Sequence, residues 1–179
     1  ALGGAVDLAL LPGRLAAWAP ALLALALVGG GNEEPGWRGL AQPELQRRHA
    51  PAAATLRLGV VWALWHLPLL WISPELRAVA AAAPGTVAAV AATTLVSITL
   101  HAFWYAWLWN RTGSLLLCVL LHAGWNAANG AIPVPFAALA PGAYLGLLGL
   151  ATGVLAASVA ALLLATGGRL GLRSPSPAP

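Results

Sequence analysis

Long apolar runs alternate along the chain with short stretches that are rich in polar residues, proline or glycine. A helix that crosses a lipid bilayer needs about 20 mostly apolar residues. Because runs of this length recur, the pattern predicts an all-α fold, a polytopic transmembrane helix bundle of about five spans. The predicted spans are Leu15–Glu34, Ala52–Ile72, Pro84–Trp109, Gly113–Asn129 and Leu139–Thr166.

The remaining segments complete a single predicted domain. The polar stretch Arg38–His49 follows the first run and predicts a short interfacial helix. Residues 15–168 form the predicted intramembrane domain, and residues 1–14 form an amino-terminal segment. The chain opens with Ala and a glycine-rich stretch, so we expect that it is an excerpt or lacks amino-terminal helices. The tail over residues 169–179 ends in RSPSPAP, which cannot pack and is predicted to be disordered.

Composition indicates that lipid is the main solvent of this chain. Hydrophobic residues make up 60% and charged residues 8% of the 179 residues, whereas soluble domains have roughly 25% charged residues. The net charge of +4 comes from arginines scattered between apolar runs, so no nucleic acid partner is expected. Cys118, the single cysteine, lies in an apolar run, which leaves neither a disulfide framework nor a cysteine-rich metal site.

The arginines divide unevenly between the two faces of the predicted bundle. One face receives Arg14 and Arg77, and the other receives the remaining seven, which are Arg38, Arg47, Arg48, Arg57, Arg111, Arg169 and Arg173. Since cytoplasmic loops carry the excess of basic residues, we expect the carboxyl terminus in the cytoplasm. The Ala, Leu and Arg bias suggests a bacterial cytoplasmic membrane, with membrane lipid as one partner.

A pair of carboxylates ends the first apolar run. Glu33 and Glu34 are adjacent, and Arg38 follows Glu34 by four residues, which places these two side chains on one helix face. A carboxylate that faces lipid is costly. The pair is therefore either part of a functional site or a cap of the span at the membrane interface.

Two further polar groups carry histidines. His66 stands in the middle of the second run, one turn after Trp62, and His122 precedes Asn126 by four residues. A lone histidine such as His66 is commonly a core residue. The second spacing places an imidazole and an amide on one helix face, where they can donate to an oxyanion or bond another helix. Counted from the arginine-rich face at about 1.5 Å per residue, all three polar groups fall at similar depths.

Taken together, these groups offer a carboxylate, two imidazoles and an amide on three different spans. They resemble the CAAX protease and bacteriocin-processing (CPBP, or Abi) family of intramembrane proteases. Its motifs are EExxxR, an aromatic residue followed four positions later by His, and HxxxN. They stand here as EEPGWRG from Glu33, as Trp62 with His66, and as His122 with Asn126. Trp62 occupies a position where many members have Phe.

The resemblance implies an intramembrane endopeptidase that hydrolyses a peptide bond without a covalent intermediate. Glu33 would be the general base, acting on a water that it holds jointly with His66. His122 and Asn126 would stabilise the tetrahedral oxyanion. A prenylated CAAX tail, a bacteriocin leader and an unrelated membrane peptide are all compatible with the expected peptide or protein substrate.

Supporting residues and metal use also follow from the resemblance. Glu34 and Arg38 would form an ion pair that orients Glu33. A zinc ion could be held by Glu33, His66 and His122 with water as the fourth ligand. No HExxH helix is present, so the usual zinc protease pattern is missing, and we favour a mechanism without a cofactor.

Three other classes of function compete with this interpretation. An inactive family member could serve as a bacteriocin-immunity or scaffold protein, although the complete set of motif residues argues against it. A haem or proton-relay protein would use His66 and His122, with His101 as a third candidate. A transporter is disfavoured because no internal repeat of about 20 to 50 residues is visible. Otherwise His101 is predicted to be a core or interfacial residue, and His49 a loop residue.

Overall fold

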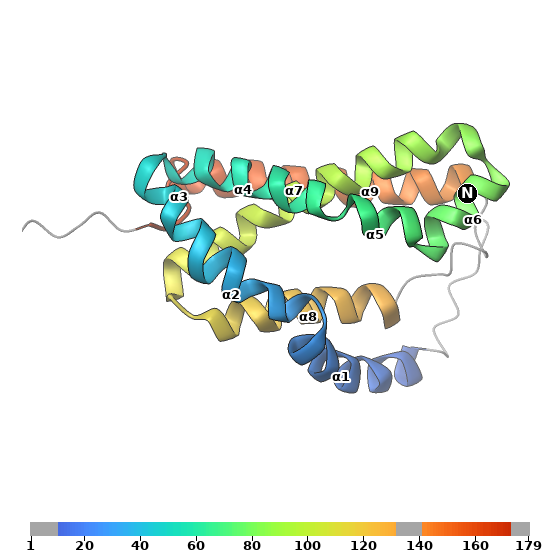
Figure 1. The fold of residues 1–179 in the computed structure, drawn as a ribbon, viewed down its shortest axis with the longest axis horizontal. Helices are drawn as coiled ribbons and strands as arrows, with labels where there is room; N and C mark the ends of the chain where they lie inside the picture. Colours follow the sequence, from blue (N-terminus) through green and yellow to red (C-terminus); the bar gives the residue numbers. More distant parts are fainter. Residues whose placement is uncertain (1–10, 132–140, 173–179) are drawn as a thin grey trace, which may run out of the picture.

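The structure is a computed structural model that describes residues 11–131 and 141–172 of the chain. These residues form helices joined by short turns, and no strand occurs among them, which confirms the all-α prediction (Figure 1). The longer helices are α1 (Leu11–Val28), α3 (Gln42–Arg48), α4 (Pro51–Trp65), α5 (Leu67–Ile72), α6 (Pro74–Ala82), α7 (Val87–Thr112), α8 (Leu115–Ala131) and α9 (Pro141–Thr166).

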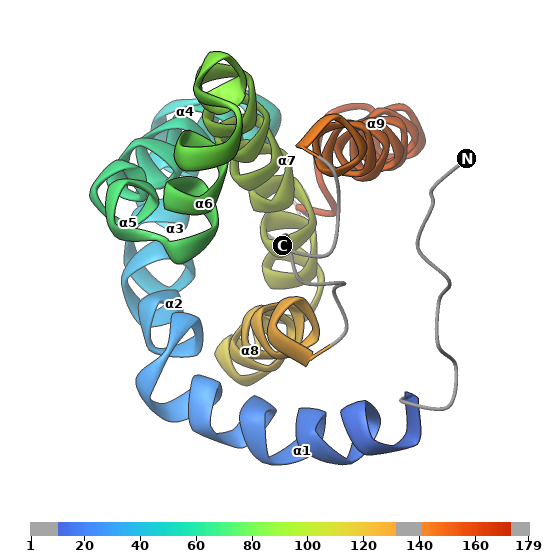
Figure 2. The ribbon, with the colours of Figure 1, turned by 90° about the vertical axis from the view of Figure 1, so that its right-hand side faces the viewer.

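Helix α7 lies at the centre of the bundle. Helices α4 and α9 pack along it, and α8 returns beside it after a tight turn (Figure 2). Gly113 ends α7 with a φ of 61°, a left-handed conformation that glycine adopts without a steric penalty. Helix α1 packs mainly against α8, so the first and fourth predicted spans are neighbours in space.

Four helical stretches among the described residues are long and apolar enough to cross a membrane, rather than five. They are Pro12–Arg48, Pro51–Leu69, Pro84–Thr112 and Gly142–Thr166, and the apolar stretch Leu115–Ala128 is shorter. Large apolar side chains on these helices point outward, with Leu27 at 77% and Leu164 at 85% exposure. Such a surface suits contact with lipid tails.

The first apolar run continues as helix past its predicted end. The 3₁₀ turn η2 (Gly30–Glu33), helix α2 (Glu34–Gly36) and the π-helical turn η3 (Trp37–Ala41) connect α1 directly to α3. The segment changes direction between α1 and α2 (Figures 1 and 2). The expected interfacial helix over Arg38–His49 is therefore the end of one long bent helical segment.

The second run contains a break that the sequence analysis does not predict. Helix α4 ends at Trp65, and α5 begins at Leu67, so His66 stands at a helix end and not in the middle of a helix. Pro68 explains the break, because proline lacks an N–H group and its ring clashes with the carbonyl four residues earlier. The amide of His66 donates instead to the carbonyl of Ala63 in a tighter turn, at 3.0 Å.

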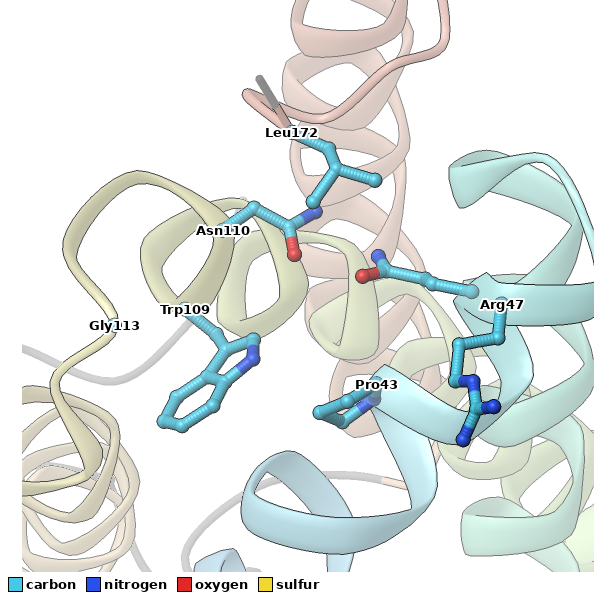
Figure 3. Close-up of a pocket in the computed structure, with 7 residues that line it drawn as sticks. Pro43, Arg47, Trp109, Asn110, Gly113 and Leu172 are labelled. Atoms are coloured by element: carbon cyan, nitrogen blue, oxygen red, sulfur yellow. The ribbon is translucent and has the colours of Figure 1, made fainter. Parts of the chain in front are cut away.

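One end of the bundle gathers the start of α4 with the ends of α7 and α9. The amide of Ala52 donates to the carbonyl of Gly168 at 3.2 Å, and Asn110 Nδ2 donates to the carbonyl of Leu170 at 3.0 Å. A pocket of about 340 Å³ opens here, lined by Pro43, Gln46, Arg47, Trp109, Asn110, Gly113 and Leu172 (Figure 3). None of the motif residues lines it, so this pocket is separate from the candidate site.

The predicted tail and the ends of the first and last predicted spans lie where the described residues begin or end. The first part of the predicted tail, residues 169–172, packs on the bundle, where Leu170 is fully buried. The RSPSPAP part, residues 173–179, lies outside the described residues, as do residues 1–10 and 132–140. Leu139, the predicted start of the last run, is among them, and α1 begins at Leu11, before the predicted Leu15.

Candidate active site

Glu34 lies at the centre of a buried polar network. Its Oε1 accepts from Nη1 of Arg38 at 3.0 Å and lies 2.7 Å from Nδ1 of His122. Glu34 and Arg38 are fully buried, and His122 is 4% exposed. The predicted ion pair between Glu34 and Arg38 therefore forms, and it also binds the histidine of the third motif.

Helix packing brings these motifs together. Helix α1 crosses α8, where the indole Nε1 of Trp18 donates to the carbonyl of Gly124 at 3.2 Å. The bend after α1 then directs α2 and η3 along α8. Glu34 on α2 consequently faces His122 on α8, although the two residues are 88 positions apart.

Aromatic rings enclose the buried arginine. The guanidinium carbon of Arg38 lies 4.6 Å from the ring centre of Trp62 and 4.4 Å from that of Tyr105. Both rings are buried. Cation–π attraction is stronger in such a desolvated place, so the two rings and Glu34 each offset part of the cost of burying this charge.

Glu33 is oriented by two indole groups. Its Oε2 accepts from Nε1 of Trp37 at 3.1 Å and from Nε1 of Trp62 at 3.0 Å. Both bonds end on the same oxygen, which leaves Oε1 available for another partner. Glu33 is only half-buried, unlike Glu34. The two adjacent carboxylates thus have different environments, one inside a polar network and one accessible.

Trp62 connects Glu33 with both histidines. Its ring centre lies 5.7 Å from that of His66 and 5.3 Å from that of His122, in edge-to-face contacts. His66 Nδ1 lies 2.7 Å from the carbonyl oxygen of Trp62. Since a carbonyl only accepts, Nδ1 carries the proton, and Nε2 of a neutral His66 keeps a lone pair. His66 is half-buried, like Glu33.

The imidazole and amide of the third motif meet at one point, as their spacing predicts. A Cβ atom placed on Gly30 would lie less than 3.0 Å from both Nε2 of His122 and Nδ2 of Asn126. Both nitrogens therefore lie against the Cα atom of Gly30 and close to each other.

The other two histidines lie apart from this network, and the cysteine borders it. His101 on α7 is half-buried, with its ring centre 4.3 Å from that of Trp125 and its Nδ1 2.8 Å from the carbonyl oxygen of Ser97. This agrees with the predicted core or interfacial role. His49 stands at the C-terminal end of α3, and Cys118 is buried beside Tyr105.

The arrangement does not favour the zinc site that the sequence left open. Among residues 11–131 and 141–172, no three His, Cys, Asp or Glu side chains are grouped as a metal ion would require. Both ring nitrogens of His122 are occupied, since Nδ1 faces Glu34 and Nε2 lies against Gly30. The set Glu33, His66 and His122 therefore does not fit a metal in this structure, and we derive no step through one.

The sequence pattern did not predict the contacts of several residues that form the site. Trp62 was expected only as an aromatic neighbour of His66, yet its N–H binds Glu33. Trp37, four residues after Glu33, could have been found from helical spacing. The contact of Tyr105 with Arg38, and that of Gly30 with the third motif, depend on helix packing and leave no signal in local sequence.

Comparison with known proteins identifies the family of this chain. The model of the family described as Type II CAAX prenyl endopeptidase Rce1-like matches residues 15–128, more than half of the chain. The chain belongs to this Rce1-like family. The matched range contains every motif residue discussed above, from Glu33 to Asn126.

A curated relative agrees with this assignment. CAAX prenyl protease 2 of Methanococcus maripaludis (strain S2 / LL) is 40% identical over 52 residues, which is 29% of this chain and 19% of the relative's length. No solved structure matches the chain. Rce1-like membership, together with the four apolar helices, makes the chain an integral membrane protein. Membership also supports a peptidase at the level of the family.

Proposed function

We propose that this Rce1-like chain carries the active site of an intramembrane endopeptidase that hydrolyses a peptide bond with a water activated by Glu33. The observation that carries the proposal is the position of Trp62. This one ring binds the carboxylate of Glu33 and contacts His66 and His122, so residues from three segments meet around one indole.

Glu33 and His66 would activate the water. Oε2 of Glu33 is held by two indoles, and Oε1 can accept a hydrogen bond from a water molecule. His66, with Nδ1 bound to a backbone carbonyl, has Nε2 available as a second acceptor. As the water oxygen attacks the peptide carbonyl carbon, Glu33 takes its proton.

His122 and Asn126 would stabilise the oxyanion that this attack creates. Nε2 of His122 and Nδ2 of Asn126 lie beside one point at Gly30. An imidazolium donates from both nitrogens, so a protonated His122 can bind Glu34 through Nδ1 and the oxyanion through Nε2. The intermediate then collapses, the C–N bond breaks, and Glu33 returns the proton to the leaving amine.

Glu34 and Arg38 act on this chemistry through other residues. Glu34 fixes the imidazole of His122, and Arg38 holds Glu34 while packing under Trp62. Both are buried, so neither reaches a substrate directly. Their proposed role is to hold Trp62 of the second motif and His122 of the third motif in a fixed relative position.

The substrate we propose is a membrane-associated peptide with a prenylated CAAX carboxyl terminus. The family description and the name of the relative both specify a CAAX prenyl peptidase. The exposed apolar surface of the helices supports contact with lipid, into which a prenyl chain partitions. A bacterial cytoplasmic membrane, with the carboxyl terminus of this chain in the cytoplasm, remains our proposal for its location.

Peptide cleavage by the reconstituted protein tests this function. Prenylated and unprenylated CAAX peptides are incubated with proteoliposomes, and products are identified by mass spectrometry. We expect cleavage of the prenylated peptide, and a fall in kcat of about 10²- to 10⁴-fold for Glu33→Ala. His122→Ala should lose about 10²- to 10³-fold.

Glu44→Ala is the matched control for these variants. Glu44 is also a carboxylate of the first helical segment, but it pairs with Arg47 and Arg48 at the surface. Its variant should cleave as the wild type does. Normal cleavage by a folded Glu33→Ala protein would remove Glu33 as the base, and no cleavage of any peptide by the wild type would contradict the function itself.

A further inference from the structure

Three consecutive glycines, Gly29, Gly30 and Gly31, form the bend between α1 and α2. Gly30 and Gly31 are buried. A Cβ atom on Gly29 or Gly31 would press against α1 itself and, for Gly31, also against Val119 of α8. These two glycines therefore serve helix packing.

Gly30 differs from its neighbours because it faces functional groups. Its added Cβ atom would lie less than 3.0 Å from Nε2 and Cδ2 of His122 and from Nδ2 of Asn126. Cβ atoms essentially never come so close to other heavy atoms. Any side chain at this position must therefore displace one or both of these groups.

His122 has little freedom to move aside. Its Nδ1 lies 2.7 Å from Glu34 Oε1, and its ring contacts Trp62 and Tyr105 at centroid distances of 5.3 Å and 5.5 Å. Rotation of the imidazole away from Gly30 would break the bond to Glu34. A methyl group at Gly30 would therefore disturb either the amide of Asn126 or the buried network behind His122.

We propose that Gly30 is a positioning residue of the active site, whose lack of a side chain lets Nε2 of His122 and Nδ2 of Asn126 both lie against its Cα atom and so keeps them close together. This inference rests on the proposed function, because it takes these two nitrogens as the oxyanion-binding pair. An accepting oxygen must stand about 2.7–3.2 Å from each donor. A methyl group on Gly30 would move at least one of these two nitrogens and so change its distance to that oxygen.

Kinetics of Gly30→Ala in proteoliposomes test the proposal with the prenylated peptide as the probe. We expect kcat to fall about 10²- to 10³-fold, with KM changed by less than about threefold, because the contact is needed in the transition state. The thermal unfolding midpoint is measured on the same samples. A kcat within about threefold of the wild type would overturn the proposal and leave the proposed function intact.

Two glycine variants provide matched controls. Gly31→Ala places a methyl group against α1 and Val119, so it reports the cost of disturbing the same bend without touching His122 or Asn126. Gly36→Ala lies on α2, where a Cβ atom meets nothing within 4 Å, and should leave both kcat and stability unchanged. A loss of kcat in Gly31→Ala as large as in Gly30→Ala would overturn the proposal.

A double variant separates displacement of the two nitrogens from general damage to the fold. In an Asn126→Ala background, one donor is already gone and the methyl group gains room, so Gly30→Ala should cost less than about tenfold. The double variant gives the same comparison if the single variant does not fold. The full loss in both backgrounds would contradict the proposal, and a wild type without cleavage would remove it together with the proposed function.

Discussion

The carboxylate of Glu34 lies between a guanidinium and an imidazole, all of them buried. Removing one partner of such a buried pair typically costs about 3–5 kcal/mol, because the other charge is left without compensation. The half-buried Glu33 next to it has only indole partners at Oε2. This difference between adjacent residues is why we assign structural support to one and proton transfer to the other.

The two indoles that hold Glu33 can be tested by removing their N–H groups. Trp62→Phe and Trp37→Phe each delete one hydrogen bond to Oε2 while keeping an aromatic ring. A hydrogen bond to a charged group is worth about 1.5–3 kcal/mol, so we expect each variant to lower kcat by about tenfold or more, and the double variant to lose more than either.

The measurement is kcat for the prenylated peptide, with the unfolding midpoint as a check on folding. Trp71→Phe serves as the control, since Trp71 is 80% exposed at the end of α5. A double variant with wild-type kcat would show that Glu33 needs no orientation by these rings.

At the scale of the helices, the backbones of α4 and α7 approach each other closely. Gly59 lies in this contact, and a Cβ atom there would stand 2.8 Å from the backbone oxygen of Thr99 and 3.1 Å from Cβ of Ala102. Small residues allow membrane helices to pack this closely. The crossing matters for the site because α4 carries Trp62 and α7 carries Tyr105, which enclose Arg38 from two sides.

We therefore expect Gly59→Ala to destabilise the protein by about 1–3 kcal/mol, since the backbone of α7 cannot yield as a side chain can. Gly153→Ala on α9 is the matched control. A Cβ atom at Gly153 meets nothing within 4 Å, so the better helix propensity of alanine should leave its stability equal or raised by up to about 1 kcal/mol. Denaturation in detergent measures both variants, and equal stability of the two would refute the packing argument.

Over the whole molecule, the polar network lies inside a bundle whose outer surface is apolar. The segment η2, α2 and η3, helix α4 with the residue after its end, and helix α8 contribute the motif residues, and the central α7 adds Tyr105. The pocket at the arginine-rich end contains none of these groups. The site therefore depends on the mutual packing of four helical segments and is not the property of any one of them.

Metal dependence is a property of this assembled site. Because the proposed mechanism uses Glu33 as the base without a metal, and the described residues form no metal-binding group, we expect kcat to be unchanged after incubation with EDTA or 1,10-phenanthroline. Peptide cleavage before and after chelator treatment measures this, with zinc added back to treated samples. Loss of activity that zinc restores would contradict the glutamate mechanism.

Sequence alone was sufficient for the membrane location, the helical class and the identity of the polar residues. These follow from the length of apolar runs and from the cost of placing charges among them, both of which are local and additive along the chain. The spacing of Glu34 and Arg38, and that of His122 and Asn126, likewise needs only helix geometry.

Packing decided the remaining features. The break at His66 depends on whether Pro68 ends α4 or only bends it, and the continuous helix from α1 to α3 depends on how the glycine bend rests on α8. The bond between Glu34 and His122, the position of Trp62 and the contact at Gly30 join residues distant in sequence. Such contacts arise from the crossing of helices, which hydrophobic periodicity does not specify, because every apolar face of a membrane helix can meet either lipid or another helix.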